Sequence, residues 1–179
     1  HPFKRMVVKV KKEIVNFGQP VDLRLSGKHI SPEEFLSIYK NDGDALILDA
    51  RNDYESRVGK FRNAMTLGIQ TFREFPNAVE CLRDKKDKKI VMYCTGGIRC
   101  EKASAYLVQQ GFSNVFQLDG GILNFGKKFP DTIWEGKCFV FDKRLLSNIN
   151  SQEQPIAKCQ ICNIECDLYK NCANSRCDE

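Results

Sequence analysis

The chain has 179 residues, which is enough for one domain with a sizeable core and a small appendage. With 42% hydrophobic and 28% charged residues, its composition is typical of a globular protein. No apolar run reaches the roughly 18 residues of a membrane-spanning helix, so we expect no membrane partner. The net charge of +5 gives weak support to an anionic partner such as RNA, although a well-solvated basic surface explains it more simply.

The nine cysteines fall into two groups. Five crowd the last 21 residues, whereas Cys81, Cys94, Cys100 and Cys138 are scattered. An odd count with this segregation does not fit a secreted disulfide framework. We therefore expect a reducing compartment, the cytoplasm, with one reactive thiol and a metal cluster. No signal sequence is visible. Because the chain begins with His-Pro rather than Met, we also expect a fragment.

The first elements in chain order alternate between strand and helix patterns. Residues 3–15 alternate apolar and basic side chains, which predicts a strand with one solvent-exposed face. Ser31, Pro32 and Glu34 form a capping-box pattern that predicts a helix. A buried strand is expected to end at Asp49, and the polar residues 52–65 are expected to form a loop.

The second half of the chain continues the alternation. The expected elements are a short helix at 76–83, a solvated turn at 84–89, a strand at 89–93, a helix at 101–110 that ends at Gly111, a strand at 114–118 and a helical start at 119–129. Strands that alternate with helices indicate an α/β domain with a mostly parallel sheet.

Cys94 ends the central apolar strand and precedes a short glycine-containing loop. In open α/β sheets, reactive groups lie beyond the carboxyl ends of the strands. The loop Thr95, Gly96, Gly97 and Ile98 can turn its N–H groups toward one point, and the following helix adds a positive partial charge. These features favour a thiolate and an anion pocket, to which Arg99 would add a guanidinium. The alternative is a buried, inert cysteine before a glycine turn.

These motifs together resemble the rhodanese domain. The six-residue loop 94–99 matches the family's active-site loop, and the resemblance extends over residues 28–129. The family's upstream signature matches at Asp49, Arg51, Glu55, Gly59 and Ala64. The resemblance implies a three-layer fold and a persulfide on Cys94, loaded from a sulfane donor such as thiosulfate and passed to a thiophilic acceptor. It implies that Asp49 and Arg51 brace the loop and that sulfur transfer requires no cofactor.

A narrower resemblance rests on the segments "RNDYE" (51–55), "FREFP" (72–76) and "CTGGIRCEKA" (94–103). Together they are similar to rhodanese-containing tRNA uridine hydroxylases, which make 5-hydroxyuridine at the wobble position. Their architecture implies that residues 1–25 end a preceding ferredoxin-like domain, that 26–137 form the rhodanese-like domain and that 138–179 form a cysteine-rich tail.

Three functions therefore stand side by side. Our main interpretation is a sulfurtransferase that acts through Cys94. The alternatives are a part of a tRNA uridine-modifying enzyme, and a non-catalytic module for interaction or sensing. Phosphatases of this fold need a C-x5-R loop, and Arg99 comes one position too early for that activity. Cys100 is either a resolving thiol for Cys94 or a helix residue packed inward, which we favour.

The tail pattern suggests a zinc module. Tetrahedral zinc accepts paired cysteines with short spacing. The predicted ligands are Cys159, Cys162, Cys172 and Cys177, with Cys166 as a rival. The alternatives are a free tail and adventitious disulfides.

Overall fold

A five-stranded sheet forms the centre of the computed structural model, which describes residues 6, 8–152, 154–159 and 161–168. The strand order is β1-β6-β5-β2-β4, and every pairing between these strands is parallel. The strands are β1 (Lys28–Ile30), β2 (Leu46–Asp49), β4 (Met65–Thr66), β5 (Lys89–Tyr93) and β6 (Asn114–Leu118). The predicted parallel α/β sheet is confirmed.

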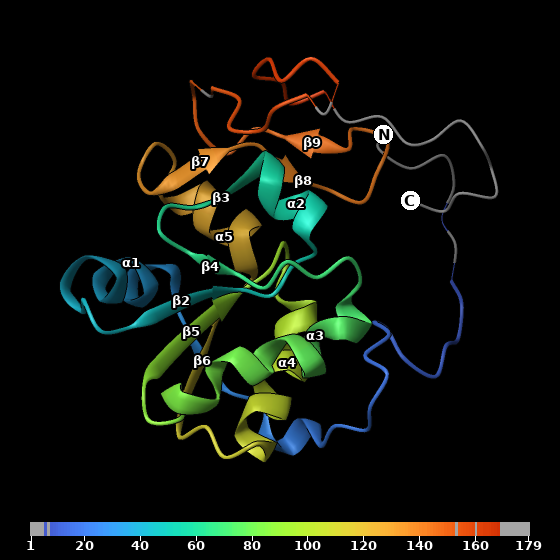
Figure 1. Ribbon diagram of the computed structural model, residues 1–179, viewed down its shortest axis with the longest axis vertical. Helices are drawn as coiled ribbons and strands as arrows, with labels where there is room; N and C mark the ends of the chain where they lie inside the picture. Colours follow the sequence, from blue (N-terminus) through green and yellow to red (C-terminus); the bar gives the residue numbers. More distant parts are fainter. Residues whose placement is uncertain (1–5, 7, 153, 160, 169–179) are drawn as a thin grey trace.

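Helices cover both faces of this sheet, which gives the expected three layers (Figure 1). Alternate residues of β5 pack in opposite directions: Ile90 and Met92 join one core cluster, and Val91 and Tyr93 join the other. The helices are α1 (Pro32–Asn41) and α5 (Gly121–Lys128) on the Tyr93 side, and α3 (Phe75–Ala78), η3 (Val79–Lys85) and α4 (Ile98–Gln109) on the Met92 side. Two further single turns are η1 (Leu23–Leu25) and η2 (Phe72–Glu74).

Two small antiparallel sheets lie together at one end of the molecule, above the central sheet in Figure 1. One pairs β3 (Gly59–Phe61) with β7 (Trp134–Gly136), and the other pairs β8 (Cys138–Phe139) with β9 (Leu146–Ser147). The β3–β7 pairing brings the chain after residue 134 back to the segment that follows β2. As a result, residues from the end of the chain lie close to elements formed much earlier.

A local signal explains where α1 begins. The backbone N–H of Glu34 donates to the Ser31 hydroxyl at 3.2 Å, and the Ser31 N–H donates to the Glu34 carboxylate at 2.9 Å. This reciprocal pair satisfies two N–H groups that the first turn of α1 leaves free. The capping box predicted at this position is confirmed.

Two secondary-structure predictions are wrong. Residues 52–65 form α2 (Asp53–Val58), β3 and β4 rather than a loop. Asn52 and Glu55 have the same capping spacing as Ser31 and Glu34, and the polar composition concealed it.

The strand predicted at 3–15 is absent from the described part of that segment. The described residues there have no neighbouring strand to accept their backbone hydrogen bonds, and a lone strand is not stable in water. The segment is instead attached by Phe17, which is fully buried against Phe72, Phe75 and Tyr106.

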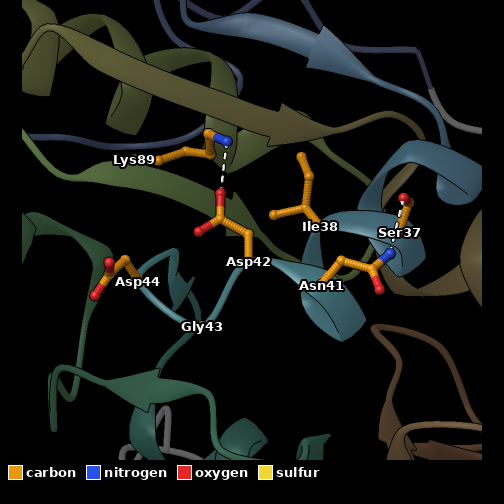
Figure 2. A pocket seen from close by; sticks show the side chains of 7 residues that line it. All are labelled: Ser37, Ile38, Asn41, Asp42, Gly43, Asp44 and Lys89. Atoms are coloured by element: carbon orange, nitrogen blue, oxygen red, sulfur yellow. Dashed lines mark hydrogen bonds and ion pairs between the residues drawn. The ribbon is translucent and has the colours of Figure 1, made fainter.

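A pocket of about 590 Å³ opens at the end of the sheet where β2 and β5 begin. Figure 2 shows the Lys89 ammonium directed at the Asp42 carboxylate, and the two groups are 2.6 Å apart. Because the strands are parallel, this end of the sheet lies opposite the ends where Asp49 and Cys94 are found. Within the part of the chain that the structure describes, no helix has the length and apolar character needed to cross a membrane.

Candidate active site

Cys94 follows the last residue of β5, and the loop after it curls back toward its sulfur. The N–H of Gly97 donates to the Cys94 Sγ at 3.1 Å. Gly97 has a φ of 93°, a left-handed conformation that glycine adopts without strain, and it is the N-cap residue of α4. The loop therefore directs a backbone donor and a helix N-terminus toward the same sulfur.

The first turn of α5 holds the other side of this loop. The N–H of Ile122 donates to the Cys94 carbonyl at 3.0 Å, and the N–H of Leu123 donates to the Thr95 carbonyl at 3.1 Å. Gly121 permits this approach because a Cβ at its position would lie 2.3 Å from the Cys94 oxygen. With its carbonyls bound to α5, the loop leaves N–H groups on the sulfur side.

Several donors lower the pKa of Cys94 to about 6. The main cause is a hydrogen bond from the Cys100 thiol, and the Arg99 charge and the N–H groups of Cys100 and Arg99 add to it, against the effect of burial. Burial and the neighbouring Cys94 raise the pKa of Cys100 well above its usual range, so it remains a donor at neutral pH. Cys94 is a stabilised thiolate at neutral pH, with only 2% of its surface exposed.

Cys100 is fully buried in the first turn of α4, as favoured from the sequence. The Cys100 thiol also lowers the pKa of Cys94, an effect that packing alone does not require.

Arg99 is engaged by Glu55 rather than free. Its Nη1 and Nη2 lie 2.5 and 2.7 Å from the two Glu55 carboxylate oxygens, and its Nη2 also lies 3.4 Å from the Thr95 hydroxyl. The Glu55 side chain is fully buried, so the pair is largely dry. Arg99 therefore contributes to the loop as a neutralised pair, and its guanidinium is less available to an external anion than the sequence suggested.

Asp49 and Arg51 form a second buried pair behind the loop. Their closest contact is 2.6 Å, and both side chains are inaccessible to solvent. Arg51 also donates to the Gly59 carbonyl at 2.6 Å, and the Tyr93 hydroxyl donates to Asp49 at 2.8 Å. These bonds join β2, β3 and β5, the strand that ends immediately before Cys94. The remaining loop residues form the outer rim: Ile98 is 53% exposed, and a Cβ at Gly96 would meet open space.

Four residues near this loop were absent from the predicted site: Asn52, Glu55, Arg73 and Phe141. Glu55 belongs to the upstream signature, so a signal for it was present in the sequence. Asn52 and Arg73 lie in two of the three segments that carried the narrower resemblance. Phe141 had no signal, because its segment comes close to Arg99 only through tertiary contacts.

The tail cysteines are described only in part. Cys172 and Cys177 lie outside the described residues, so the predicted zinc set has no geometry here. At Cys159, backbone N–H groups of Cys162 and Ile161 lower the pKa of the thiol, with a further hydrogen bond from the Cys162 side chain. A turn that favours thiolate suits a metal-binding pair. Among the described residues, however, no cluster of three or more metal-binding side chains is present.

The fold and the loop define an α/β protein with a stabilised cysteine thiolate at the carboxyl end of a parallel sheet. The model of the rhodanese-like domain family matches residues 31–128, and that of the rhodanase C-terminal family matches residues 135–179. The chain belongs to the rhodanese-like domain family. A rhodanese-like domain from Anabaena sp. shares this fold with a TM-score of 0.51 and 21% identity, over 60% of this chain and 78% of that one.

The curated relatives define a narrower group. The tRNA uridine(34) hydroxylase of Chlamydia caviae is 47% identical over 98% of this chain, and that of Chlamydia muridarum is 46% identical over the same share. Each alignment covers 55% of the relative, so the chain spans about half the length of the curated relatives that it matches.

These names contradict our main functional interpretation, a generic sulfurtransferase, and favour the tRNA-modifying alternative. The physical reason is that a thiolate-stabilising loop identifies the nucleophile and carries no information about the group that meets it.

Proposed function

We propose that this chain is the rhodanese-like part of an enzyme that hydroxylates uridine 34 of tRNA, with Cys94 as its reactive residue. The observation that carries the proposal is the 46–47% identity to tRNA uridine(34) hydroxylases over 98% of the chain. The geometry at Cys94 supports it, because a thiolate held by Gly97 and Cys100 is a nucleophile at neutral pH. The net charge of +5 suits a polyanionic substrate.

Each part of the loop has a defined role in this proposal. Gly97 and Cys100 hold the negative charge on the sulfur, and α5 fixes the loop backbone. The Arg99–Glu55 pair locks the first turn of α4 to α2. These contacts position the thiolate before the substrate arrives, so that little reorganisation is needed during the reaction.

The proposal is tested on tRNA from cells that lack the whole protein. Mass spectrometry of digested tRNA measures 5-hydroxyuridine at position 34, which we expect to fall in the deletion strain. The full-length wild-type protein should restore the modification, and Cys94→Ser should not. Cys81→Ser is the matched control, because Cys81 is exposed and lies on η3, outside the loop. Unchanged modification in the deletion strain, or restoration by Cys94→Ser, contradicts the proposal.

A further inference from the structure

Gly97 joins two cysteines at the start of α4. Its N–H donates to the Cys94 sulfur at 3.1 Å, and its carbonyl accepts a hydrogen bond from the N–H of Cys100 at 3.0 Å. Both cysteine side chains belong to the same buried core cluster, and each thiol shifts the pKa of the other. The turn that stabilises the Cys94 thiolate therefore also brings a second thiol close to it.

No other cysteine of the described residues has this position. Cys94 and Cys100 are the only described cysteines in their core cluster. Cys138 is buried in the cluster on the opposite face of the sheet, and Cys81 is exposed on η3. Among the described residues, Cys100 is therefore the thiol that meets the Cys94 sulfur with the least rearrangement.

The Cys94 thiolate is the form of the residue that peroxides oxidise. Its pKa of about 6 keeps the sulfur deprotonated at neutral pH, and thiolates react with oxidants much faster than thiols do. Only 2% of the Cys94 surface is exposed, which favours a small oxidant over a bulky one. The same burial keeps large external thiols away from the oxidised sulfur, so the thiol that resolves it has to come from the protein itself.

We infer that Cys94 and Cys100 form a reversible disulfide when a small hydroperoxide oxidises Cys94. The Cys94 sulfur attacks one peroxide oxygen, the O–O bond breaks, and the other oxygen takes up a proton and leaves as water or an alcohol. The Cys100 sulfur then attacks the sulfenic acid on Cys94, the S–O bond breaks, and the hydroxyl leaves with the Cys100 proton as water. The two thiols lose two electrons in total, and these electrons reduce the peroxide.

Oxidation of Cys94 itself favours the second step. Burial and the neighbouring Cys94 thiolate together raise the pKa of Cys100. When an oxygen is added, the negative charge leaves the Cys94 sulfur, so this second contribution falls and Cys100 loses its proton more easily. Gly96 leaves room for the loop to move while the bond forms, because a Cβ at its position would meet open space.

The disulfide has two consequences for the site. It removes the thiolate, so the nucleophile is lost until the bond is reduced. It also protects the Cys94 sulfur, because a sulfenic acid without a resolving thiol is oxidised further to sulfinic acid, which thiols do not reduce. The pair is thus a modification site that protects the reactive residue, and this inference does not depend on which substrate reacts with Cys94.

The test is oxidation of the reduced full-length protein with a few equivalents of hydrogen peroxide, after which free thiols are blocked with iodoacetamide in urea. Trypsin cleaves after Arg99, between the two cysteines. The disulfide therefore joins two otherwise separate peptides, residues 90–99 and residues 100–102. Mass spectrometry should find most of the oxidised Cys94 in this linked form, and dithiothreitol should separate the peptides and restore alkylation of Cys94.

Three variants show whether the bond depends on Cys100. Cys100→Ser removes the resolving sulfur at nearly unchanged size, so we expect no linked peptides and at least about threefold more sulfinic acid on Cys94 than in the wild type. Cys138→Ser and Cys81→Ser are the matched controls, one for a buried and one for an exposed cysteine. Both should form the linked peptides as the wild type does.

Several results would overturn the inference. In the wild type these are an unoxidised Cys94, an oxidised Cys94 beside a Cys100 that is still alkylated, and a bond from Cys94 to any other cysteine. Equal sulfinic acid on Cys94 in the wild type and in Cys100→Ser would also overturn it. The wild-type results decide the matter even where Cys100→Ser does not fold, and none of them depends on whether uridine 34 is hydroxylated.

Discussion

At the scale of single residues, the site depends on which groups surround one sulfur atom. Cys100 and Gly97 donate to Cys94, and Arg99 adds a positive charge that Glu55 compensates. The thiolate is therefore stabilised mainly by close hydrogen bonds and only secondarily by net charge. This distinction leads to different expectations for Cys100 and for Glu55.

Removal of the Cys100 thiol should raise the pKa of Cys94. In the wild type, alkylation of Cys94 should increase with pH around a midpoint near 6, because the thiolate is the reactive form. A hydrogen bond to a charged group contributes about 1.5–3 kcal/mol, so Cys100→Ala should move the midpoint upward by about one pH unit or more. Mass spectrometry of the Cys94 peptide after iodoacetamide pulses at several pH values measures the midpoint.

Two variants show whether the effect is specific. Cys100→Ser retains a donor and should keep most of the low midpoint. Cys138→Ala removes another fully buried cysteine and should leave the midpoint unchanged. An unshifted profile in Cys100→Ala would mean that Cys100 serves packing alone.

Glu55→Ala should destabilise the fold strongly. The Glu55 side chain is fully buried and that of Arg99 is 10% exposed, so the substitution leaves a largely buried guanidinium without its partner. Such a loss costs about 3–5 kcal/mol, which urea denaturation measures. The matched control is Glu80→Ala, whose exposed pair with Arg83 should contribute no more than about 1 kcal/mol. Similar losses in the two variants would contradict a structural role for the buried pair.

At the scale of elements, the sequence predicted those whose signals are local. The apolar runs of β2, β5 and β6 and the capping box of α1 were read correctly. α2 was missed because its buried residues include the polar Glu55 and Ser56, so it has no simple apolar stripe.

The candidate site likewise contains residues that local sequence signals predict and residues that they do not. Cys94 and its loop follow from the glycines and the end of a strand, which are local features. The pocket beside Arg99 does not, because Asn52, Arg73 and Phe141, which line it, meet only through tertiary pairing. Pairing between distant segments leaves no pattern in a single sequence. The strand predicted at residues 3–15 was wrong for the same reason, because a stable strand needs a pairing partner.

The start of α5 offers a sharp test of how the loop is held. Gly121→Ala places a Cβ 2.3 Å from the Cys94 carbonyl oxygen, at a residue with a φ of 60°. We expect a loss of roughly 1–3 kcal/mol and a higher alkylation midpoint for Cys94, because the loop must move. Gly43→Ala is the matched control, since a Cβ there meets open space. A wild-type midpoint in Gly121→Ala would show that α5 does not shape the loop.

The zinc module of the tail stays a prediction. The lowered pKa of the Cys159 thiol and its x2 spacing to Cys162 are consistent with one half of a tetrahedral site. We expect about one zinc ion per chain by elemental analysis after gel filtration under reducing conditions. Cys159→Ser should lose it and Cys81→Ser should keep it. Absence of metal, with all five tail thiols titratable, would contradict the predicted zinc module.

At the scale of the whole molecule, the parallel sheet separates two regions. The carboxyl ends of β2 and β5 carry Asp49 and Cys94, whereas the pocket around Asp42 and Lys89 lies where these strands begin. The β3–β7 pairing adds the tail to the Cys94 end, where Phe141 lines a pocket together with Arg99. The thiolate and the pocket beside Arg99 therefore both lie at one end of the sheet.

A substitution at the opposite end tests this separation. Lys89→Gln removes the charge that meets Asp42 at 2.6 Å, in a pair whose side chains are 38% and 32% exposed. Partly exposed pairs contribute about 0–1 kcal/mol, so the fold should persist. In the full-length protein, the proposed hydroxylation of uridine 34 should stay within about twofold of wild type in Lys89→Gln, whereas Cys94→Ser should abolish it. A large loss in Lys89→Gln at unchanged stability would place part of the function at the strand starts, because only a substrate or partner contact there could account for it.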